Sequence, residues 1–338
     1  MNYKNIKLEK GMYAVPNKSF TEVLEEMDPS SEYRGTSLEH LDAFERQLKR
    51  FDIKVSGAGS DAVQKFYQTS DAPALFPEYL ARAIRQGMEE ANIIDDIVAT
   101  TTKIDSMDYR TITSIPDKNN KTMKLLTEGE TFPSTTVKAQ SNLVALKKRG
   151  RMLEASYEAI KYQKLDLFTV TLKQIGTYLA TTLLQDAVTV IMDGDGNENP
   201  ADVIETAAAK TLTYQDLLNL WDQFGAYQLN TMLVSPDMMM KMLSIDEFKN
   251  PLTGLNFQGT GKLTSPLGAT LYKSSTVPEG TILGFDRRFA LERVIASDIM
   301  VEYDKLIDKQ LDRATISTIT GFSKIFKDAS KVLSLAIE

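Results

Sequence analysis

The sequence predicts an α+β fold, and three observations predict it. Residues 104–152 alternate polar and apolar side chains around a strongly polar turn, which is typical of extended strands. Residues 166–192 carry apolar side chains at steps of three and four, which is typical of a long amphipathic helix. Beyond residue 200, short apolar strands alternate with capped helices, which indicates a compact α/β region.

The composition excludes several kinds of chemistry. The 338 residues include no cysteine and a single histidine, His40. Disulfides, thiolate nucleophiles and cysteine-type zinc sites are therefore excluded, and most metal or Ser-His sites cannot be built within one chain. No run of about 18 apolar residues is present, so we expect no membrane span, and we expect no cofactor. The net charge of −7 does not favour a protein that grips nucleic acid.

The first ninety residues predict short helical pieces separated by turns. An apolar stripe that includes Phe44 and Leu48 falls at helical spacing over residues 38–51, and residues 78–90 predict another helix. These pieces lack a strong core of their own, so we expect an arm that packs on a neighbouring subunit. Phe44 and Leu48 are candidate contacts of that arm.

The extended stretch predicts a hairpin. Residues 104–115 and 123–127 are its expected strands, and the polar residues 117–121 form its turn. A hairpin this long and polar is poorly placed to bury itself, so it needs a partner surface. The candidate contact residues along it are Tyr109, Lys118, Lys121, Glu128 and Glu130.

A short basic run, Lys147-Lys148-Arg149 with Arg151, follows the hairpin. A run of this kind is more often a solvated strand or a charged subunit contact than a nucleic-acid patch. We therefore take Arg149 and Arg151 as candidate contact residues.

The predicted long helix would span roughly 40 Å and ends at an acidic, glycine-containing turn. Asp193, Asp195 and Asn197 have the first three ligand spacings of an EF-hand. However, Glu198 stands where the sixth-position glycine is expected, and Ile204 where the bidentate glutamate is expected. We therefore expect a helix-capping turn and no metal site.

The α/β region has clear local signals. Thr213 and Asp216 have the spacing of a capping box that opens a helix. Residues 231–234 predict a buried strand, and Ser235-Pro236 starts the next helix. Further strands are expected at residues 281–285, 290–294, 301–306 and 314–321.

Five local sequences, in this order along the chain, resemble major capsid proteins of tailed phages of the Hong Kong 97 type. They are Leu-Leu-Thr-Glu-Gly-Glu at 125–130, the basic strand at 146–156, the long helix with its Gly-Asp-Gly turn at 166–196, Leu-Val-Ser-Pro at 233–236 and Gly-Phe-Asp-Arg-Arg at 284–288. The resemblance covers roughly residues 76–335.

The resemblance implies a capsid fold with an N-terminal arm, an extended β-hairpin loop, a peripheral domain with a long spine helix, and an axial α/β domain. The expected boundaries are 1–75 for an N-terminal extension, in which a scaffold-like role is one alternative, 76–104 for the N-arm helix, 105–140 for the extended loop, 141–197 with 298–338 for the peripheral domain, and 198–297 for the axial domain.

The resemblance also implies a structural function without catalysis. The expected role is self-assembly, as hexamers and pentamers, into an icosahedral phage head that encloses double-stranded DNA without sequence specificity. The other expected partners are a portal and scaffold or decoration proteins, with no membrane. The expected location is the virion capsid, after assembly in the host bacterial cytoplasm.

Two alternatives stay open. An encapsulin-like nanocompartment shell has the same fold, although the long N-terminal extension favours the phage version. A carboxylate enzyme is the remote alternative, because Glu128 and Glu130 flank Gly129 at a spacing that places them on one face of a strand. No nucleophile, base and orienting group converge around that pair in the sequence.

Overall fold

The computed structural model describes residues 3–15, 18–114, 125–130, 132, 137–156, 162–250, 265–306 and 311–336. The chain divides into two compact units. Unit 1 comprises Met1–Asn92, Lys148–Ala180 and Asp298–Thr318, and unit 2 comprises Ile93–Lys147, Thr181–Ser297 and Ile319–Glu338.

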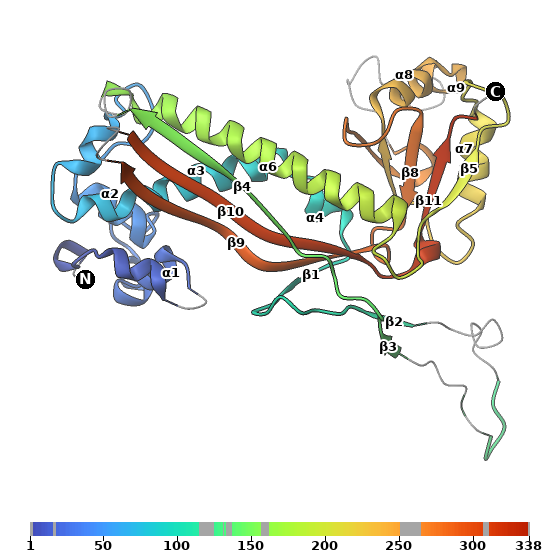
Figure 1. Ribbon diagram of the computed structural model, residues 1–338, viewed down its shortest axis with the longest axis horizontal. Helices are drawn as coiled ribbons and strands as arrows, with labels where there is room; N and C mark the ends of the chain where they lie inside the picture. The colour runs from blue at the N-terminus through green and yellow to red at the C-terminus, as the bar shows by residue number, and fades with distance from the viewer. Residues whose placement is uncertain are drawn as a thin grey trace. The chain divides into compact units, whose positions relative to one another are not determined.

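The N-terminal part of unit 1 is helical (Figure 1). Its α-helices are α1 (Phe20–Met27), α2 (Ala43–Arg50) and α3 (Phe76–Ala91), and 3-10 turns lie between them. The predicted helix at 38–51 begins five residues late, because Asp42 and Glu45 form a capping box at the start of α2. The helix predicted at 78–90 corresponds to α3.

The first fifty residues have a buried polar network as well as apolar side chains. The guanidinium of Arg46, which is 0% exposed, donates from Nε to Asp28 at 2.6 Å and from Nη1 to the carbonyl of Leu41. Tyr33 stacks on the same guanidinium, 4.3 Å from its ring centroid, and donates its hydroxyl to Asp28. A buried charge is tolerated only when its donors are satisfied, so this region has a specific fold of its own rather than that of a loose arm.

The helix predicted at 166–192 is confirmed as α6 (Leu165–Asp193). By length and composition, α6 would also be able to cross a membrane. One part of its apolar surface is buried inside the chain, since Leu165, Leu172, Ala187 and Ile191 are each 0% exposed. Another part is exposed, including Leu167 and Val170 at 60% each.

A four-stranded sheet has the order β1-β9-β10-β4. Its strands are β1 (Thr100–Lys103), β9 (Leu291–Leu306), β10 (Leu311–Lys324) and β4 (Lys147–Ser156). The two strands predicted at 290–294 and 301–306 are one continuous strand, β9. Strands β9 and β10, like α6, contribute residues to both units.

A five-stranded mixed sheet in unit 2 has the order β5-β11-β8-β6-β7. Its strands are β5 (Asp202–Glu205), β11 (Ser330–Ser334), β8 (Thr281–Phe285), β6 (Thr231–Val234) and β7 (Thr270–Lys273). β11 pairs with both β5 and β8. The expectation that all of residues 298–338 belong with the peripheral domain is therefore corrected, because the last strand completes the sheet of the α/β region.

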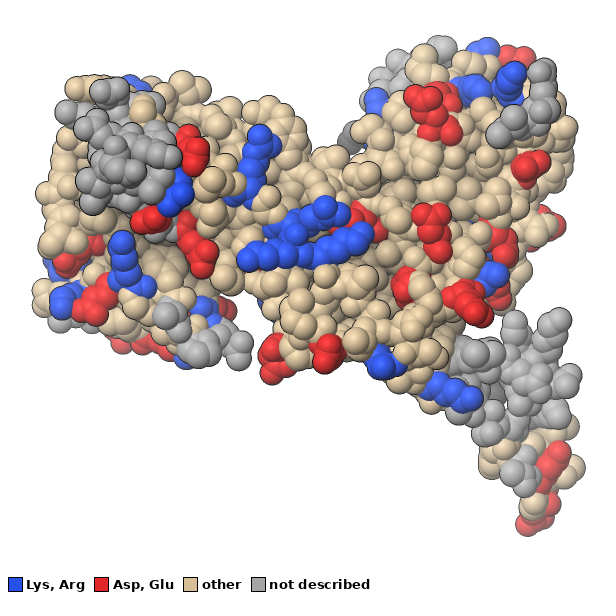
Figure 2. Space-filling view, in the orientation of Figure 1, with Lys and Arg blue, Asp and Glu red and all other residues tan. Residues whose placement is uncertain are grey.

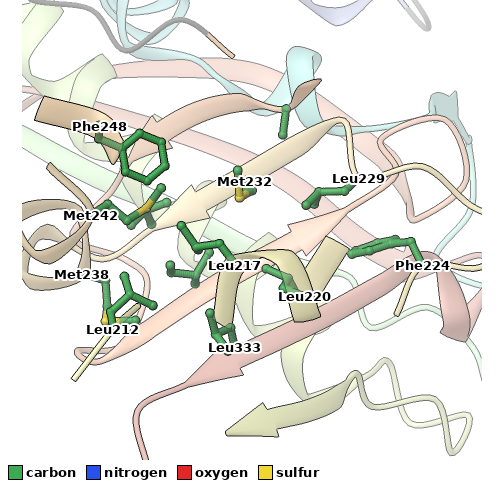
Figure 3. Close-up of a cluster of buried hydrophobic side chains, with 13 residues drawn as sticks. Leu212, Leu217, Leu220, Phe224, Leu229, Met232, Met238, Met242, Phe248 and Leu333 are labelled. Atoms are coloured by element: carbon green, nitrogen blue, oxygen red, sulfur yellow. The ribbon is translucent and has the colours of Figure 1, made fainter. Parts of the chain in front are cut away.

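The core of this α/β region lies between its sheet and its helices α7 (Tyr214–Asp222), α8 (Pro236–Ser244) and α9 (Asp246–Lys249) (Figure 3). Leu217 and Leu220 of α7 and Met238 and Met242 of α8 are each 0% exposed. The capping box predicted at Thr213 and Asp216 is confirmed at the start of α7. A further short helix of unit 2 is α4 (Ile94–Ile97).

Candidate assembly surfaces

The extended loop leaves unit 2 as a narrow two-stranded ribbon. Strands β2 (Ile112–Ser114) and β3 (Val137–Ala139) pair antiparallel, with Ile112 opposite Ala139. The return strand was predicted at 123–127, but β2 pairs with β3 instead. Residues 121–124 lie outside the described part of the chain, and residues 127–130 form a turn.

The outgoing leg of the ribbon is tied to β9 through a buried carboxylate. Glu292, 4% exposed, accepts hydrogen bonds from the hydroxyls of Thr102 at 2.5 Å, Tyr109 at 2.8 Å and Thr111. Burial, and then the bond to Glu292, raises the pKa of Tyr109. The structure thus places the candidate contact residue Tyr109 at the root of the loop, where its hydroxyl is held inside the chain.

The return leg meets the acidic turn that ends α6. Gly194 has φ +84° directly after the helix, and its N–H donates to the carbonyl of Val190, as in a left-handed C-terminal cap. Asn197 donates to Gln140 at 2.7 Å and accepts from the backbone of Asn142 at 2.9 Å. The turn therefore binds the loop as well as capping the helix.

Asp195 is the centre of that turn. Its carboxylate accepts hydrogen bonds from Asn197, from the hydroxyl of Ser323 at 2.8 Å and from the backbone N–H of Lys324 at 2.9 Å. Burial by itself would raise the pKa of Asp195, but these hydrogen bonds outweigh it and lower the pKa. Within the described residues no group of three or more His, Asp or Glu side chains is placed to hold a metal. The oxygens of Asp195 are committed to the protein.

The described part of the loop far from the root exposes large apolar side chains. Leu125 is 97% exposed and Phe132 is 78% exposed. Between them, Gly129 has φ +84° in a turn, and the carboxylate of Glu130 accepts from the backbone of Thr127 at 3.1 Å. Glu128 and Glu130 are both exposed on that turn. Lys118 and Lys121 lie outside the described residues.

A second exposed surface lies on β4 and the first half of α6. Figure 2 shows a band of Lys and Arg side chains over the region where β4 runs in Figure 1. Arg151 places its guanidinium carbon 5.9 Å from the ring centroid of Tyr178 on α6, within cation–π range. Arg149 lies on the same face of β4 because residues two apart in a strand point the same way.

The same face of α6 is apolar at exposed positions. Leu167, Val170 and Tyr178 are 60%, 60% and 50% exposed, and their spacing places them along one stripe of the helix. Large apolar side chains exposed together are typical of a surface that another protein covers.

Phe44 and Leu48 do not contribute to an exposed surface. They are 2% and 6% exposed, and the ring of Phe44 lies under the guanidinium of Arg82, 4.4 Å away. Their helix packs on α1 and on the first residues of the chain. The expectation that both contact a neighbour is corrected, because the N-terminal pieces pack against one another and α3 and so bury this stripe.

Sequence reasoning missed three features of these surfaces. Glu292 gave a signal only as a charged residue inside an apolar strand, and its donors lie more than 180 positions away. Leu125 and Phe132 are apolar residues among polar ones in the loop, and this pattern was the signal that could have identified them as contact residues. The exposed stripe of α6 gave none, because its apolar residues look like core until the helix is placed.

Known proteins resemble the chain at two levels. The family model "Phage capsid protein" matches residues 138–308, just over half of the chain. No curated protein matches the sequence significantly. Solved structures with the same fold include the virus-like particle from Pyrococcus furiosus, at TM-score 0.52 and 12% identity, with 77% of this chain and 99% of that chain covered.

Two capsid structures match as well. The capsid of the cyanophage P-SCSP1u has a TM-score of 0.53 and 16% identity, with 73% of this chain and 89% of that chain covered. The capsid of the native GTA particle has a TM-score of 0.54 and 15% identity, with 72% and 90% covered. At these identities the structures show the shared fold, and the family match shows the family. The chain belongs to the phage capsid protein family, with the Hong Kong 97-type fold and the structural role of a major capsid protein.

Proposed function

We propose that the protein assembles with copies of itself, as hexamers and pentamers, into the icosahedral shell of a phage head around double-stranded DNA. The observation that carries this proposal is the exposed apolar tip of the extended loop, where Leu125 is 97% exposed. Burying a side chain of this size is worth about 2 kcal/mol, so an assembled form that covers it is favoured.

The tip fits the basic and apolar face of a second copy. Leu125 and Phe132 carry apolar surface, and Glu128 and Glu130 carry negative charge beside it. The face formed by β4 and α6 carries the complementary set, with Arg149 and Arg151 beside exposed apolar side chains of α6. Complementary charges select the partner, and the apolar side chains supply the burial.

The remaining parts of the proposal follow from the family. Portal, scaffold and decoration proteins are further partners, the virion capsid is the location, and assembly takes place in the host bacterial cytoplasm. The role is structural rather than catalytic. With a net charge of −7, the chain would hold packaged DNA loosely and without sequence specificity. The domain boundaries expected from the sequence belong to this proposal too, except that β11, which pairs with β5 and β8, joins the axial domain.

A charge exchange tests the docking. Glu128→Arg should block shell formation, because it places a cation against Arg149 and Arg151. Arg151→Glu should block it as well, and the double variant should recover at least a tenth of the wild-type shell yield. Negative-stain microscopy and sedimentation of the purified proteins measure that yield.

The matched control is Glu89→Arg, which reverses an exposed charge on α3 and should leave the yield within twofold of wild type. Wild-type protein that forms only small discrete oligomers under all conditions would overturn the shell itself. Normal shells from the single variants would overturn the docking surface alone.

A nanocompartment shell is the second candidate, favoured by the match over 99% of the virus-like particle from Pyrococcus furiosus. The contents of shells purified from the native source separate the two functions. Packaged double-stranded DNA supports the phage head, and a protein cargo in place of DNA supports the nanocompartment.

A further inference from the structure

The root of the extended loop is held on both of its legs within unit 2. The legs pair with each other, since Gln140 N–H donates to the carbonyl of Thr111 and Val144 N–H to that of Tyr109, each at 2.9 Å. The paired legs then contact β10, where Gln140 donates to the carbonyl of Lys324 at 2.9 Å. The two legs are therefore joined to each other at the base of the ribbon, and that base is fixed to a sheet.

Glu292 is the centre of the attachment on β9. Three hydroxyl donors, one at the end of β1 and two on the outgoing leg, meet a single carboxylate that is 4% exposed. Hydrogen bonds from neutral donors to an ionised acceptor are shorter and stronger than those between neutral groups. A buried carboxylate also has no water to replace a lost donor, so any movement of the outgoing leg leaves it under-satisfied.

We propose that Glu292 is a positioning residue that fixes the direction in which the extended loop leaves the sheet. The inference rests on the proposed function for its purpose, because the direction of the loop decides where its tip meets a second copy. Tyr109 and Thr111 place the outgoing leg, and the β2–β3 ladder transmits that placement to the return leg.

The alternative is that the loop is held by its backbone ladder and by the Asp195 turn, with Glu292 as a satisfied core carboxylate. The two readings differ in what happens when only the carboxylate is changed. Glu292→Gln keeps the size of the side chain but replaces an oxygen acceptor with an amide nitrogen that cannot accept. Glu292→Asp keeps the charge and shortens the reach.

Hydrogen exchange on the unassembled, full-length protein makes the test. Glu292→Gln should speed exchange at the amides of Gln140 and Val144 at least tenfold, while the amides of β6 and β8 stay within twofold of wild type. Tyr109→Phe, which removes one donor, should speed the same two amides at least threefold. Glu292→Asp should give a smaller effect than Glu292→Gln. Glu302→Gln, at an exposed carboxylate on the same strand, is the matched control and should change neither set.

The inference would be overturned if the amides of Gln140 and Val144 exchange within twofold of their wild-type rates in both Glu292→Gln and Tyr109→Phe. If Glu292→Gln speeds exchange everywhere, Tyr109→Phe alone decides the matter. Microscopy of the same proteins separates this inference from the function. If the wild-type protein forms shells and every variant keeps wild-type exchange in the loop, the shell function stands and the role of Glu292 is refuted. If Glu292→Gln speeds exchange in the loop but the wild-type protein never assembles, the role of Glu292 stands and the shell function is refuted.

Discussion

Lys324 is a buried lysine at the C-terminal end of α6. It is 1% exposed, and its Nζ donates to the carbonyl of Ile191 at 3.0 Å. A cation is favourable there, because the last carbonyls of a helix carry partial negative charge. Burial nevertheless lowers the pKa of Lys324 to about 8, and the attraction of Asp202 offsets this only in part.

This pKa predicts a pH dependence of stability. In the unfolded chain Lys324 titrates near 10.5, so between pH 8 and 10.5 the unfolded state binds a proton that the native state has released. The free energy of unfolding should therefore rise through that window, by up to about 3 kcal/mol from this group, and the full cost of the buried charge should apply below pH 8. Urea unfolding of wild type and Lys324→Met at pH 7.5, 9 and 10 measures the rise as a change in their difference.

The difference in unfolding free energy between wild type and Lys324→Met cancels the contribution of tyrosines, because both proteins contain the same tyrosines. Lys54→Met, at an exposed lysine that is not among the charges acting on Lys324, is the control and should show no such trend against wild type. A difference between wild type and Lys324→Met that stays constant from pH 7.5 to 10 would show that Lys324 keeps an ordinary pKa.

At this scale the sequence identified local signals and missed distant ones. The turn at Asp193 to Asn197 was predictable as a cap, because glycines directly after an apolar helix are a local pattern. The partners of Asp195 were not predictable, since Ser323 and Lys324 lie 128 and 129 positions away. Arg46 lies in the helix predicted at 38–51, and only the fold shows that this charged side chain is fully buried.

Helices α3 and α6 cross at a pair of glycines. A Cβ added at Gly176 would lie 2.6 Å from the backbone nitrogen of Met88, and one added at Gly87 would lie 2.6 Å from the carbonyl carbon of Lys173. Beside this crossing, Tyr79 of α3 donates its hydroxyl to the carbonyl of Leu165 at 2.9 Å. The two backbones are therefore in direct contact, which any side chain larger than hydrogen prevents.

Gly176→Ala should destabilise the protein. Alanine favours a helix over glycine by about 1 kcal/mol, but its methyl group would force α3 and α6 apart, and overpacking of this kind costs about 1–3 kcal/mol or more. We expect a net loss of about 1–2 kcal/mol in the free energy of unfolding, measured by urea titration. Gly11→Ala is the matched control, since nothing lies within 4 Å of its added Cβ. Equal stability of the two variants would show that the crossing is loose.

Elements with a strong local period were predictable, and those that depend on pairing were not. The long helix and strand β6 matched their predicted bounds closely, because apolar periodicity and flanking turns define them. The predicted pairing partner of β2, residues 123–127, was wrong, because nothing local in that sequence distinguishes a returning strand from a turn. The single strand β9 looked like two, because the charged Asp298 interrupts its apolar pattern.

The N-terminal region and the extended loop differ in how much of their large apolar side chains is buried. Phe20, Phe44 and Phe66 are each 2% exposed or less, and the first residues are tied down by bonds from Gln47 to the carbonyl of Tyr3 and from Arg50 to that of Ile6. The region expected to behave as an arm is therefore folded, because a buried ion network and two capping boxes supplement its apolar side chains. The sequence showed the pieces, but not that they would pack on one another.

This contrast predicts where a protease cuts the native, unassembled protein. Chymotrypsin needs an exposed Phe or Leu in a segment that can open locally, and opening is easiest where few side chains are buried. Cleavage after Leu125 or its neighbour Leu126 should therefore be at least ten times faster than cleavage after Phe20, Phe44 or Phe66, as measured by mass spectrometry of early fragments. Leu125→Gln with Leu126→Gln should abolish the fast cut and leave the slow ones unchanged. Early fragments that begin within residues 21–67 would contradict the folded N-terminal region, and a tip that is cut equally fast in assembled shells would contradict its burial against a second copy.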